Sequence, residues 1–330
     1  MITAAIILGV LGLFILLGKW ILFPKYEELE VTGKYEITSE DYWVTEEKED
    51  PFLEGTRREV QVRAWYPEDY DADAKLPVIM ASHGSCGTID NNRSLYRELA
   101  SHGYVVLAVS HPGHAFRTLH SNGKKQGVSM RYLSEMGGMD PQGKPEEAAK
   151  LFKKWMELRM TDLSVVMDDF KERCKKTPGR FANADPDRFV TFGHSAGGAA
   201  ALGMARIRED VAAVIALESP CMYDIKGVKD GEYIMDDSDY AVPVLNVYSD
   251  SGYSHLHEWK QYRNNVKFLE SENEKYKNIY YKGVGHIGLC DFSLVSPVLT
   301  RIMDGKKSDI PAGELLKRLN ADCLDFLQKI

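Results

Sequence analysis

The segment Gly193–Gly197 reads G-x-S-x-G with Ser195 at its centre, and it stands between a strand-like and a helix-like run. The apolar stretch RFVTF precedes it, and the helix-forming stretch GAAAL follows it. A serine on such a sharp strand-to-helix turn is held in a strained conformation with its hydroxyl exposed above the sheet edge. Glycines two residues to either side let the neighbouring backbone pass without a Cβ clash. We therefore predict that Ser195 is a nucleophile, and not part of a glycine-rich helix start without chemistry.

A serine hydroxyl needs a base that takes its proton, and in this arrangement the base follows the serine in the chain. The histidines after Ser195 are His255, His257 and His286. His286 follows the strand-like run NIYYKG in a Gly-Val-Gly-His loop, from which its side chain can lean over the turn. His255 and His257 flank a helix start, and a His-x-His pair without a third ligand does not indicate a metal site. We predict that His286 is the general base and that no metal or cofactor is used.

Two carboxylates end successive strand-like runs downstream of the serine. Glu218 ends VAAVIALE, 23 residues after Ser195, and Asp250 follows PVLNVYS. The acid in such a site only orients the imidazole and stabilises its cation, so either a glutamate or an aspartate can serve. The residues alone leave the acid open between Glu218 and Asp250.

An oxyanion needs two backbone N–H groups aimed at the developing charge. The residue after the nucleophile, Ala196, is one expected donor. The loop Ser-His-Gly-Ser-Cys-Gly follows the early strand-like run PVIMA, and Gly84 lets it turn its amides inward. We predict that the backbone of Ser85 is the second donor.

Short apolar runs alternate with helical patterns along most of the chain, which predicts an α/β fold with a mostly parallel central sheet flanked by helices. The segment 112–150 has no clear period, and a loop of that length inside a domain is typical of an insertion or lid. The expected strands are 34–45, 59–65, 77–82, 104–110, 188–193, 211–218, 243–249 and 278–283. The expected helices are 90–102, 146–175, 196–207, 257–273, 288–303 and 312–329.

The first 24 residues are unusually apolar. Residues 2–23 as a helix would cover about 33 Å, enough to cross a bilayer core, with Lys19 and Trp20 placed to anchor one interface. A removable signal peptide would have a basic start and a small-residue cleavage site, and this segment has neither. The sequence thus predicts a single-pass N-terminal transmembrane helix (1–24), an acidic stalk with the first strand (25–57) and a catalytic domain (58–330). Lys19 and Lys25 on the C-terminal flank favour a cytoplasmic body.

The net charge and the cysteines exclude some classes of partner and of protein. The 330-residue chain carries a net charge of −8, so it has no basic surplus for phosphates and nucleic acid is not an expected partner. Its five cysteines are scattered without a CxxC pair, which fits free thiols better than a disulfide framework.

Several segments together resemble the α/β-hydrolase superfamily, in particular its platelet-activating-factor acetylhydrolase and dienelactone-hydrolase-like branch. The resemblance implies the α/β-hydrolase fold, and the proteins of this branch that act as acetylhydrolases place their acid after the strand that ends at Glu218, although there it is an aspartate. It therefore favours Glu218 over Asp250. Dienelactone hydrolases use a cysteine nucleophile, whereas this chain has Ser195. The matching segments are VQVRAWYP, LPVIMASHG, ELASHGYVVLAVSH, LRMTDLSVVMDDF, FGHSAGGAAAL and GVGHIGLCDFS.

These features predict a serine carboxylic-ester hydrolase that works through an acyl-enzyme. The apolar N-terminus and the resemblance favour lipid-like or short-acyl esters as substrates. The same residues could also serve an amidase or an acyltransferase. A catalytically dead, membrane-anchored binding scaffold is the alternative from another class, but such a scaffold is expected to lack members of the triad.

Overall fold

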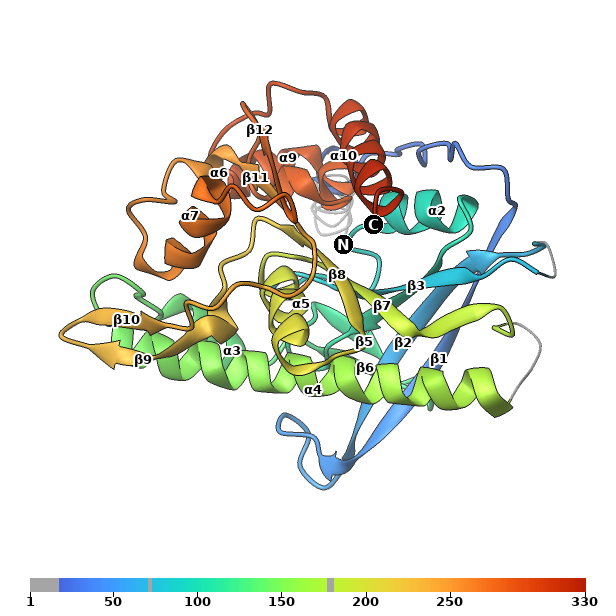
Figure 1. Cartoon of the computed structure of the whole chain (residues 1–330), viewed down its shortest axis with the longest axis horizontal. Helices are drawn as coiled ribbons and strands as arrows, with labels where there is room; N and C mark the ends of the chain where they lie inside the picture. Colours follow the sequence, from blue (N-terminus) through green and yellow to red (C-terminus); the bar gives the residue numbers. More distant parts are fainter. Residues whose placement is uncertain (1–17, 71–72, 177–180) are drawn as a thin grey trace, which may run out of the picture.

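One eight-stranded sheet organises the protein, in a computed structural model that describes residues 18–70, 73–176 and 181–330. The strands follow the order β1-β2-β4-β3-β7-β8-β11-β12 across the sheet (Figure 1). Their bounds are β1 Ile37–Glu49, β2 Arg57–Pro67, β3 Leu76–Ser82, β4 Val105–Ser110, β7 Ala184–His194, β8 Val211–Leu217, β11 Val244–Ser249 and β12 Tyr276–Tyr281.

In this order, the six strands β4, β3, β7, β8, β11 and β12 pair in parallel, and β1 and β2 add an antiparallel edge. In register, Ser82 pairs with Gly193, and His194 pairs with Leu217. Leu217 in turn lies beside Val247. The carboxyl ends of β3, β7, β8 and β11 therefore meet at one edge of the sheet, which is where open α/β sheets hold their functional residues.

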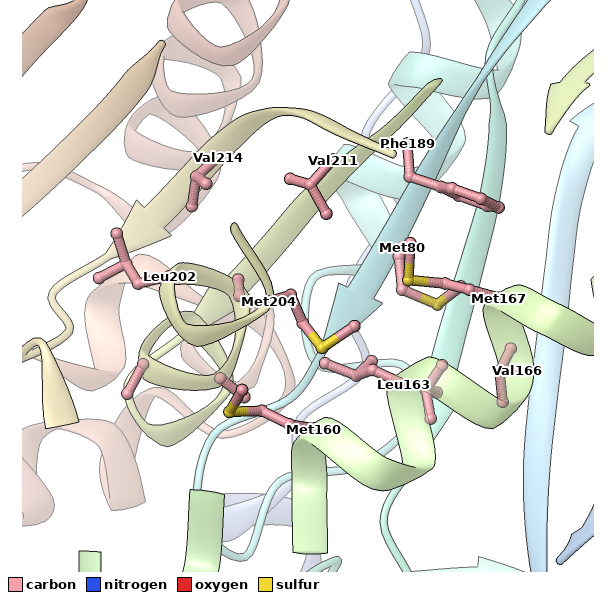
Figure 2. Packing of buried hydrophobic residues seen from close by; sticks show 14 of the residues in the cluster. Met80, Met160, Leu163, Val166, Met167, Phe189, Leu202, Met204, Val211 and Val214 are labelled. Carbon is pink, nitrogen blue, oxygen red and sulfur yellow. The ribbon is translucent and has the colours of Figure 1, made fainter. Parts of the chain in front are cut away.

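Helices cover both faces of the sheet (Figure 1). The helices α4 (Pro145–Lys176) and α5 (Ala196–Ile207) lie on one face, and α2 (Arg93–Ser101) and α10 (Ala312–Leu327) lie on the other. Figure 2 shows the packing on the face covered by α4 and α5, where Met160 and Leu163 of α4 pack with Met204 of α5. Because both faces are covered, the parallel strands are apolar throughout and lack the alternation of a half-exposed sheet.

The remaining elements extend this framework. The segment 112–150 holds the short hairpin β5 (Arg117–Leu119) and β6 (Lys125–Gly127), the helix α3 (Met130–Gly137) and the start of α4. The hairpin β9 (Ile225–Lys229) and β10 (Glu232–Met235) was not among the expected strands. The other helices are α6 Asp250–Tyr253, α7 Arg263–Glu270, α8 Phe292–Val295 and α9 Pro297–Met303.

Two expected helices are shorter than their apolar pattern indicates. The pattern over 288–303 is divided at Ser296, whose φ of −145° is not helical and whose hydroxyl accepts a hydrogen bond from the amide of Leu299. Pro297 then begins α9, the first-turn position that proline suits. The pattern over 257–273 contains only α7 and a preceding single turn.

The N-terminal anchor lies mostly outside the described residues. Residues 18–22 form the described end of a helix, and the carbonyl of Leu22 accepts a hydrogen bond from the Ser296 hydroxyl. None of the helices in the part of the chain that the structure describes is both long and apolar enough to span a bilayer. Because residues 1–17 are not described, the anchor over 2–23 stays a prediction.

Candidate active site

Ser195 occupies a sharp turn between β7 and α5. Its backbone has φ 56° and ψ −125°, a conformation that is strained for a residue with a side chain. The turn also brings backbone segments into close contact. A Cβ on Gly193 would lie 2.2 Å from the carbonyl carbon of Gly197, and a Cβ on Gly197 would lie 2.0 Å from the carbonyl oxygen of Ser82. Only glycine fits at these two positions, which explains the spacing of the G-x-S-x-G pattern.

His286 lies beside this turn and pairs with Glu218. Its Nδ1 is 2.9 Å from Oε2 of Glu218, and its half-buried ring lies 4.5 Å, centroid to centroid, from that of His194, which precedes Ser195. The backbone amide of His286 donates to the Ser251 hydroxyl at 3.1 Å. With the Nδ1 proton donated to a carboxylate, Nε2 carries the lone pair that can accept a proton.

Glu218 is held as a carboxylate at the end of β8. It is 1% exposed, and its oxygens accept hydrogen bonds from the amides of Ser249 and Gly252 and from the Ser249 hydroxyl. Burial raises the pKa of Glu218, but the hydrogen bond and charge of His286 and the Ser249 donors outweigh burial and bring the pKa below its ordinary value. A positive φ of 46° turns the residue out of the strand. The side chain is therefore ionised and fixed, as an orienting acid must be.

Asp250, the other candidate acid, has different partners. Its carboxylate accepts hydrogen bonds from the Tyr280 hydroxyl at 2.5 Å and from the Gly283 amide at 3.1 Å, and it forms an ion pair with Lys306. Burial raises the pKa of Asp250, but Lys306 and the other donors bring it below its ordinary value. Asp250 thus braces the end of β12, on the chain that leads to His286, and does not contact the imidazole in the described structure.

The loop after β3 lies against the nucleophile. A Cβ on Gly84 would be 3.4 Å from the Cβ of Ser195. Among the described residues, the amides of Ser85 and Ala196 have no hydrogen-bond acceptor. Two unpaired N–H groups beside a serine are what an oxyanion requires. The Ser85 hydroxyl is committed elsewhere, at 2.6 Å from the Tyr132 hydroxyl.

Among the described residues, neither His255 nor His257 has a hydrogen bond or ring contact with Ser195, Glu218 or His286. The His255 ring stacks on Trp259 at 4.3 Å, and its Nδ1 pairs with Glu258. Within the described ranges, no three side chains of the metal-binding types gather into a cluster.

Two buried groups near the site were not singled out from the sequence. His194 is 3% exposed and its Nε2 donates to the backbone carbonyl of His286 at 3.0 Å, which fixes the loop that holds the base. Burial and the neighbouring His286 hold the pKa of His194 well below its ordinary value, so it is neutral. The second group contains Arg159 and Asp162, both completely buried on α4. Two charged residues one turn apart within the apolar stretch LRMTDLSVVM were the available signal.

The sheet order, the flanking helices and the turn at Ser195 define an α/β-hydrolase fold. Among solved structures, the ferulic acid esterase from Streptomyces cinnamoneus superposes with a TM-score of 0.64 at 17% sequence identity, covering 92% of each chain. This likeness confirms the predicted fold class. A comparison with curated proteins gave no significant match.

Within this class, residues 31–131 match the family model described as platelet-activating factor acetylhydrolase, isoform II. The matched part includes β1 to β4, the loop with Gly84 and Ser85, and the start of α3. The predicted resemblance to acetylhydrolases of this kind is thereby confirmed for the N-terminal third of the chain. Ser195, Glu218 and His286 lie beyond the matched residues.

Proposed function

We propose that this chain is a serine carboxylic-ester hydrolase in which Ser195 is the nucleophile, His286 the general base and Glu218 the orienting acid. The observation that carries the proposal is the 2.9 Å contact between Glu218 and His286 next to the strained turn at Ser195. A buried carboxylate, an imidazole and a partly exposed serine on a strand-to-helix turn are the parts that acyl transfer needs.

In the first half-reaction, the Ser195 hydroxyl attacks the ester carbonyl carbon while His286 takes its proton on Nε2. The carbonyl π electrons move to oxygen, and the resulting oxyanion accepts hydrogen bonds from the amides of Ser85 and Ala196. Glu218 stabilises the imidazolium. When the tetrahedral adduct collapses, the C–O bond to the alcohol breaks and His286 returns the proton to the leaving oxygen. The acyl group remains on Ser195.

In the second half-reaction, water replaces the alcohol. His286 takes a proton from water, the hydroxyl adds to the acyl carbon, and the same two amides hold the oxyanion. Collapse releases the carboxylic acid and gives the proton back to Ser195. Every step uses groups of this chain and water.

Lipid-like or short-acyl esters are the proposed substrate class. The support is the match of residues 31–131 to the acetylhydrolase family model, together with the esterase name of the structural neighbour. An acyl-enzyme can also be formed from an amide or transferred to another alcohol. A series of aryl esters of increasing acyl length, a matched aryl amide and a competing alcohol acceptor distinguish these reactions.

The test of the nucleophile is the substitution Ser195→Ala, with Ser238→Ala as a matched control on an exposed loop. We expect Ser195→Ala to lower ester turnover by about 10⁴-fold or more and to abolish labelling by a fluorophosphonate probe, with the melting temperature unchanged. Ser238→Ala should match the wild type in both assays. Undiminished turnover in Ser195→Ala would overturn the proposal.

We also propose that residues 2–23 tether the enzyme to a membrane. The support is the apolar sequence of this segment and the exposure of Trp20 and Ile21 at its described end (77% and 61%). Removal of residues 1–24 should release the protein from the membrane fraction of expressing cells and leave ester turnover per active site unchanged. A truncated chain that stays in the membrane fraction, or a full chain that never enters it, would contradict the tether.

A further inference from the structure

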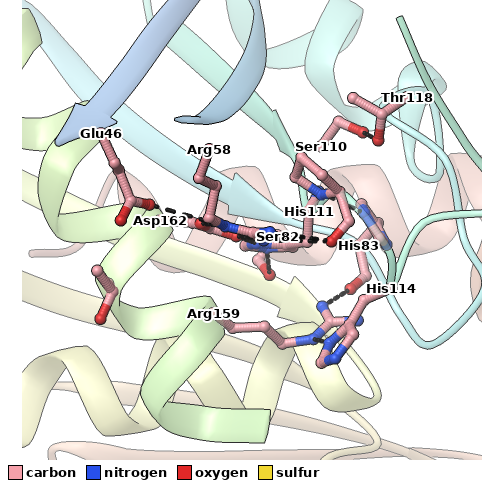
Figure 3. Close-up of polar contacts among 12 residues, drawn as sticks. Glu46, Arg58, Ser82, His83, Ser110, His111, His114, Thr118, Arg159 and Asp162 are labelled. Carbon is pink, nitrogen blue, oxygen red and sulfur yellow. Dashed lines mark hydrogen bonds and ion pairs between the residues drawn. The ribbon is translucent and has the colours of Figure 1, made fainter. Parts of the chain in front are cut away.

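We propose that Arg159 is a positioning residue for the oxyanion hole, because its guanidinium holds the peptides on either side of Gly84 so that the Ser85 amide faces the reacting carbonyl. The inference rests on the proposed ester hydrolysis by Ser195. It concerns a residue on α4, which supplies none of the triad. Figure 3 shows Arg159 pointing from α4 toward the loop that carries His83.

The contacts of Arg159 fix two carbonyl groups. Its Nη1 donates to the carbonyl oxygen of His83 at 2.6 Å, and its Nη2 approaches the carbonyl oxygen of Gly84 at 3.4 Å. The described peptide bonds contain no cis form, so each N–H points away from the carbonyl of the same peptide group. Holding the Gly84 carbonyl toward α4 therefore turns the Ser85 N–H away from α4. The Ser85 amide then has no acceptor in the described structure, whereas the carbonyl oxygen of Gly84 does accept hydrogen bonds.

Neighbouring side chains hold Arg159 in this position (Figure 3). Its Nε donates to Nδ1 of His114 at 3.3 Å, and the His114 ring stacks on Tyr132 at a centroid distance of 3.7 Å. The Tyr132 hydroxyl reaches the Ser85 hydroxyl. One chain of contacts thus links Arg159 to both the backbone and the side chain of the expected oxyanion donor.

His83 donates to the same carbonyl oxygen of Gly84 as Arg159 does. Its Nε2 accepts a hydrogen bond from the His111 amide at 3.1 Å, which makes Nδ1 the donor to the Gly84 carbonyl at 2.6 Å. Burial and the charge of Arg159 hold the pKa of His83 well below its ordinary value, which keeps this neutral tautomer. His111 is held in turn by Asp162 at 2.8 Å. Arg159 and Asp162, three residues apart on α4, therefore act on the same loop.

Burial removes the guanidinium of Arg159 from water and so costs solvation free energy. The side chain is 0% exposed, and none of the described carboxylates forms an ion pair with it, since Asp162 pairs with Arg58. Burial lowers the pKa of Arg159. Replacing buried charged groups by apolar side chains of similar volume is often neutral or stabilising, so stability alone does not account for an arginine at this position. In a site that develops negative charge, the same cation polarises the two peptides toward the oxyanion.

The test compares Arg159→Met and Arg159→Lys with Arg206→Met, which removes a partly buried arginine from its pair with Asp224 at the far end of α5. Rates are expressed per active site titrated with the fluorophosphonate probe. We expect Arg159→Met to lower kcat by about 10²-fold with KM within about threefold, in keeping with the loss of one oxyanion donor. Arg159→Lys should retain more activity, because one ammonium can still reach one carbonyl. Arg206→Met should match the wild type per active site.

The decisive readout is the affinity of an aryl trifluoromethyl ketone, which forms a tetrahedral adduct with an oxyanion. We expect its dissociation constant to rise in proportion to the loss of kcat/KM, while the acid limb of the pH–rate profile, which reports His286, does not move. An unchanged ketone affinity per active site, or an unchanged kcat in both Arg159 variants, would overturn the inference. If Arg159→Met does not fold, Arg159→Lys alone decides by the same two criteria. A wild-type protein without ester turnover or probe labelling would instead refute the proposed function.

Discussion

Replacing Glu218 by glutamine should impair catalysis by changing the tautomer of His286. All groups around the carboxylate are donors: Oε1 accepts from the amides of Ser249 and Gly252, and Oε2 accepts from the Ser249 hydroxyl and from Nδ1 of His286. The two backbone amides cannot reverse, so the single oxygen of the glutamine must face them. Its NH₂ group then faces His286, and Nδ1 becomes an acceptor. The proton moves to Nε2, where His286 can no longer take one from Ser195.

The expected cost is about 10⁴-fold in kcat, as when the acid of such a triad becomes an amide, and this equals about 5.4 kcal/mol. Asp250→Asn is the matched control, because it removes the same charge from the next strand end. Its partners are Tyr280, Gly283 and Lys306, so it should lower kcat less than about tenfold.

The assay is ester turnover per titrated active site, with thermal unfolding recorded for both variants. A mild effect of Glu218→Gln together with a severe effect of Asp250→Asn would refute the reasoning and assign the orienting role to Asp250. Two mild effects would refute the need for a carboxylate at Nδ1.

Two further predictions concern the fold. Burial and a hydrogen bond with Asp162 raise the pKa of Glu46 from an ordinary 4.5 to about 7. Between these two pH values the Glu46 carboxyl is protonated in the native state and ionised in the unfolded state. The stability that the neutral carboxyl gives the native state is therefore lost as pH rises through about 7. Glu46→Gln should therefore raise the melting temperature relative to wild type at pH 8.5 and change it little at pH 4.5; a gain confined to low pH would contradict the sign. Gly193→Ala should destabilise the protein by several kcal/mol or prevent folding, because its Cβ would lie 2.2 Å from a backbone atom. Gly227→Ala is the control and should be tolerated, because the atom nearest to its Cβ would be a side-chain end at 3.9 Å. Urea unfolding of the two alanine variants checks this contrast, and equal stabilities would contradict it.

The alternation of apolar strands with helical patterns predicted the central sheet because parallel strands covered on both faces are apolar along their whole length. The structure places six of the eight expected strands within two residues of their predicted bounds. It begins β1 three residues later and ends it four residues later, at Glu49, and it begins β7 four residues earlier, at Ala184. The hairpin β9–β10 escaped prediction because its strands have only 5 and 4 residues, and the first of them, IKGVK, carries two lysines and a glycine. The split at Ser296 escaped because the apolar pattern continues across a residue that is itself a helix cap.

The candidate site could be predicted only in part. The turn at Ser195 has a local signature, since its glycines must pack backbone against backbone. The choice between Glu218 and Asp250 had no local signature, because it depends on where two strand ends meet His286. Arg159 was hidden for a related reason. A buried cation on a helix is recognisable only once the carbonyl groups that accept its hydrogen bonds, 76 and 75 residues earlier in the chain, are placed beside it.

The central claim, that Ser195 carries the acyl group during ester hydrolysis, is tested most directly by trapping the intermediate. The protein is mixed with an aryl acetate, quenched in acid within milliseconds, and digested for mass spectrometry. We predict a burst of one phenol per active site and a single acetyl adduct on the peptide that contains Ser195, with no adduct in Ser195→Ala. Steady ester turnover without an adduct, or an adduct on another residue such as Cys86, would contradict the claim.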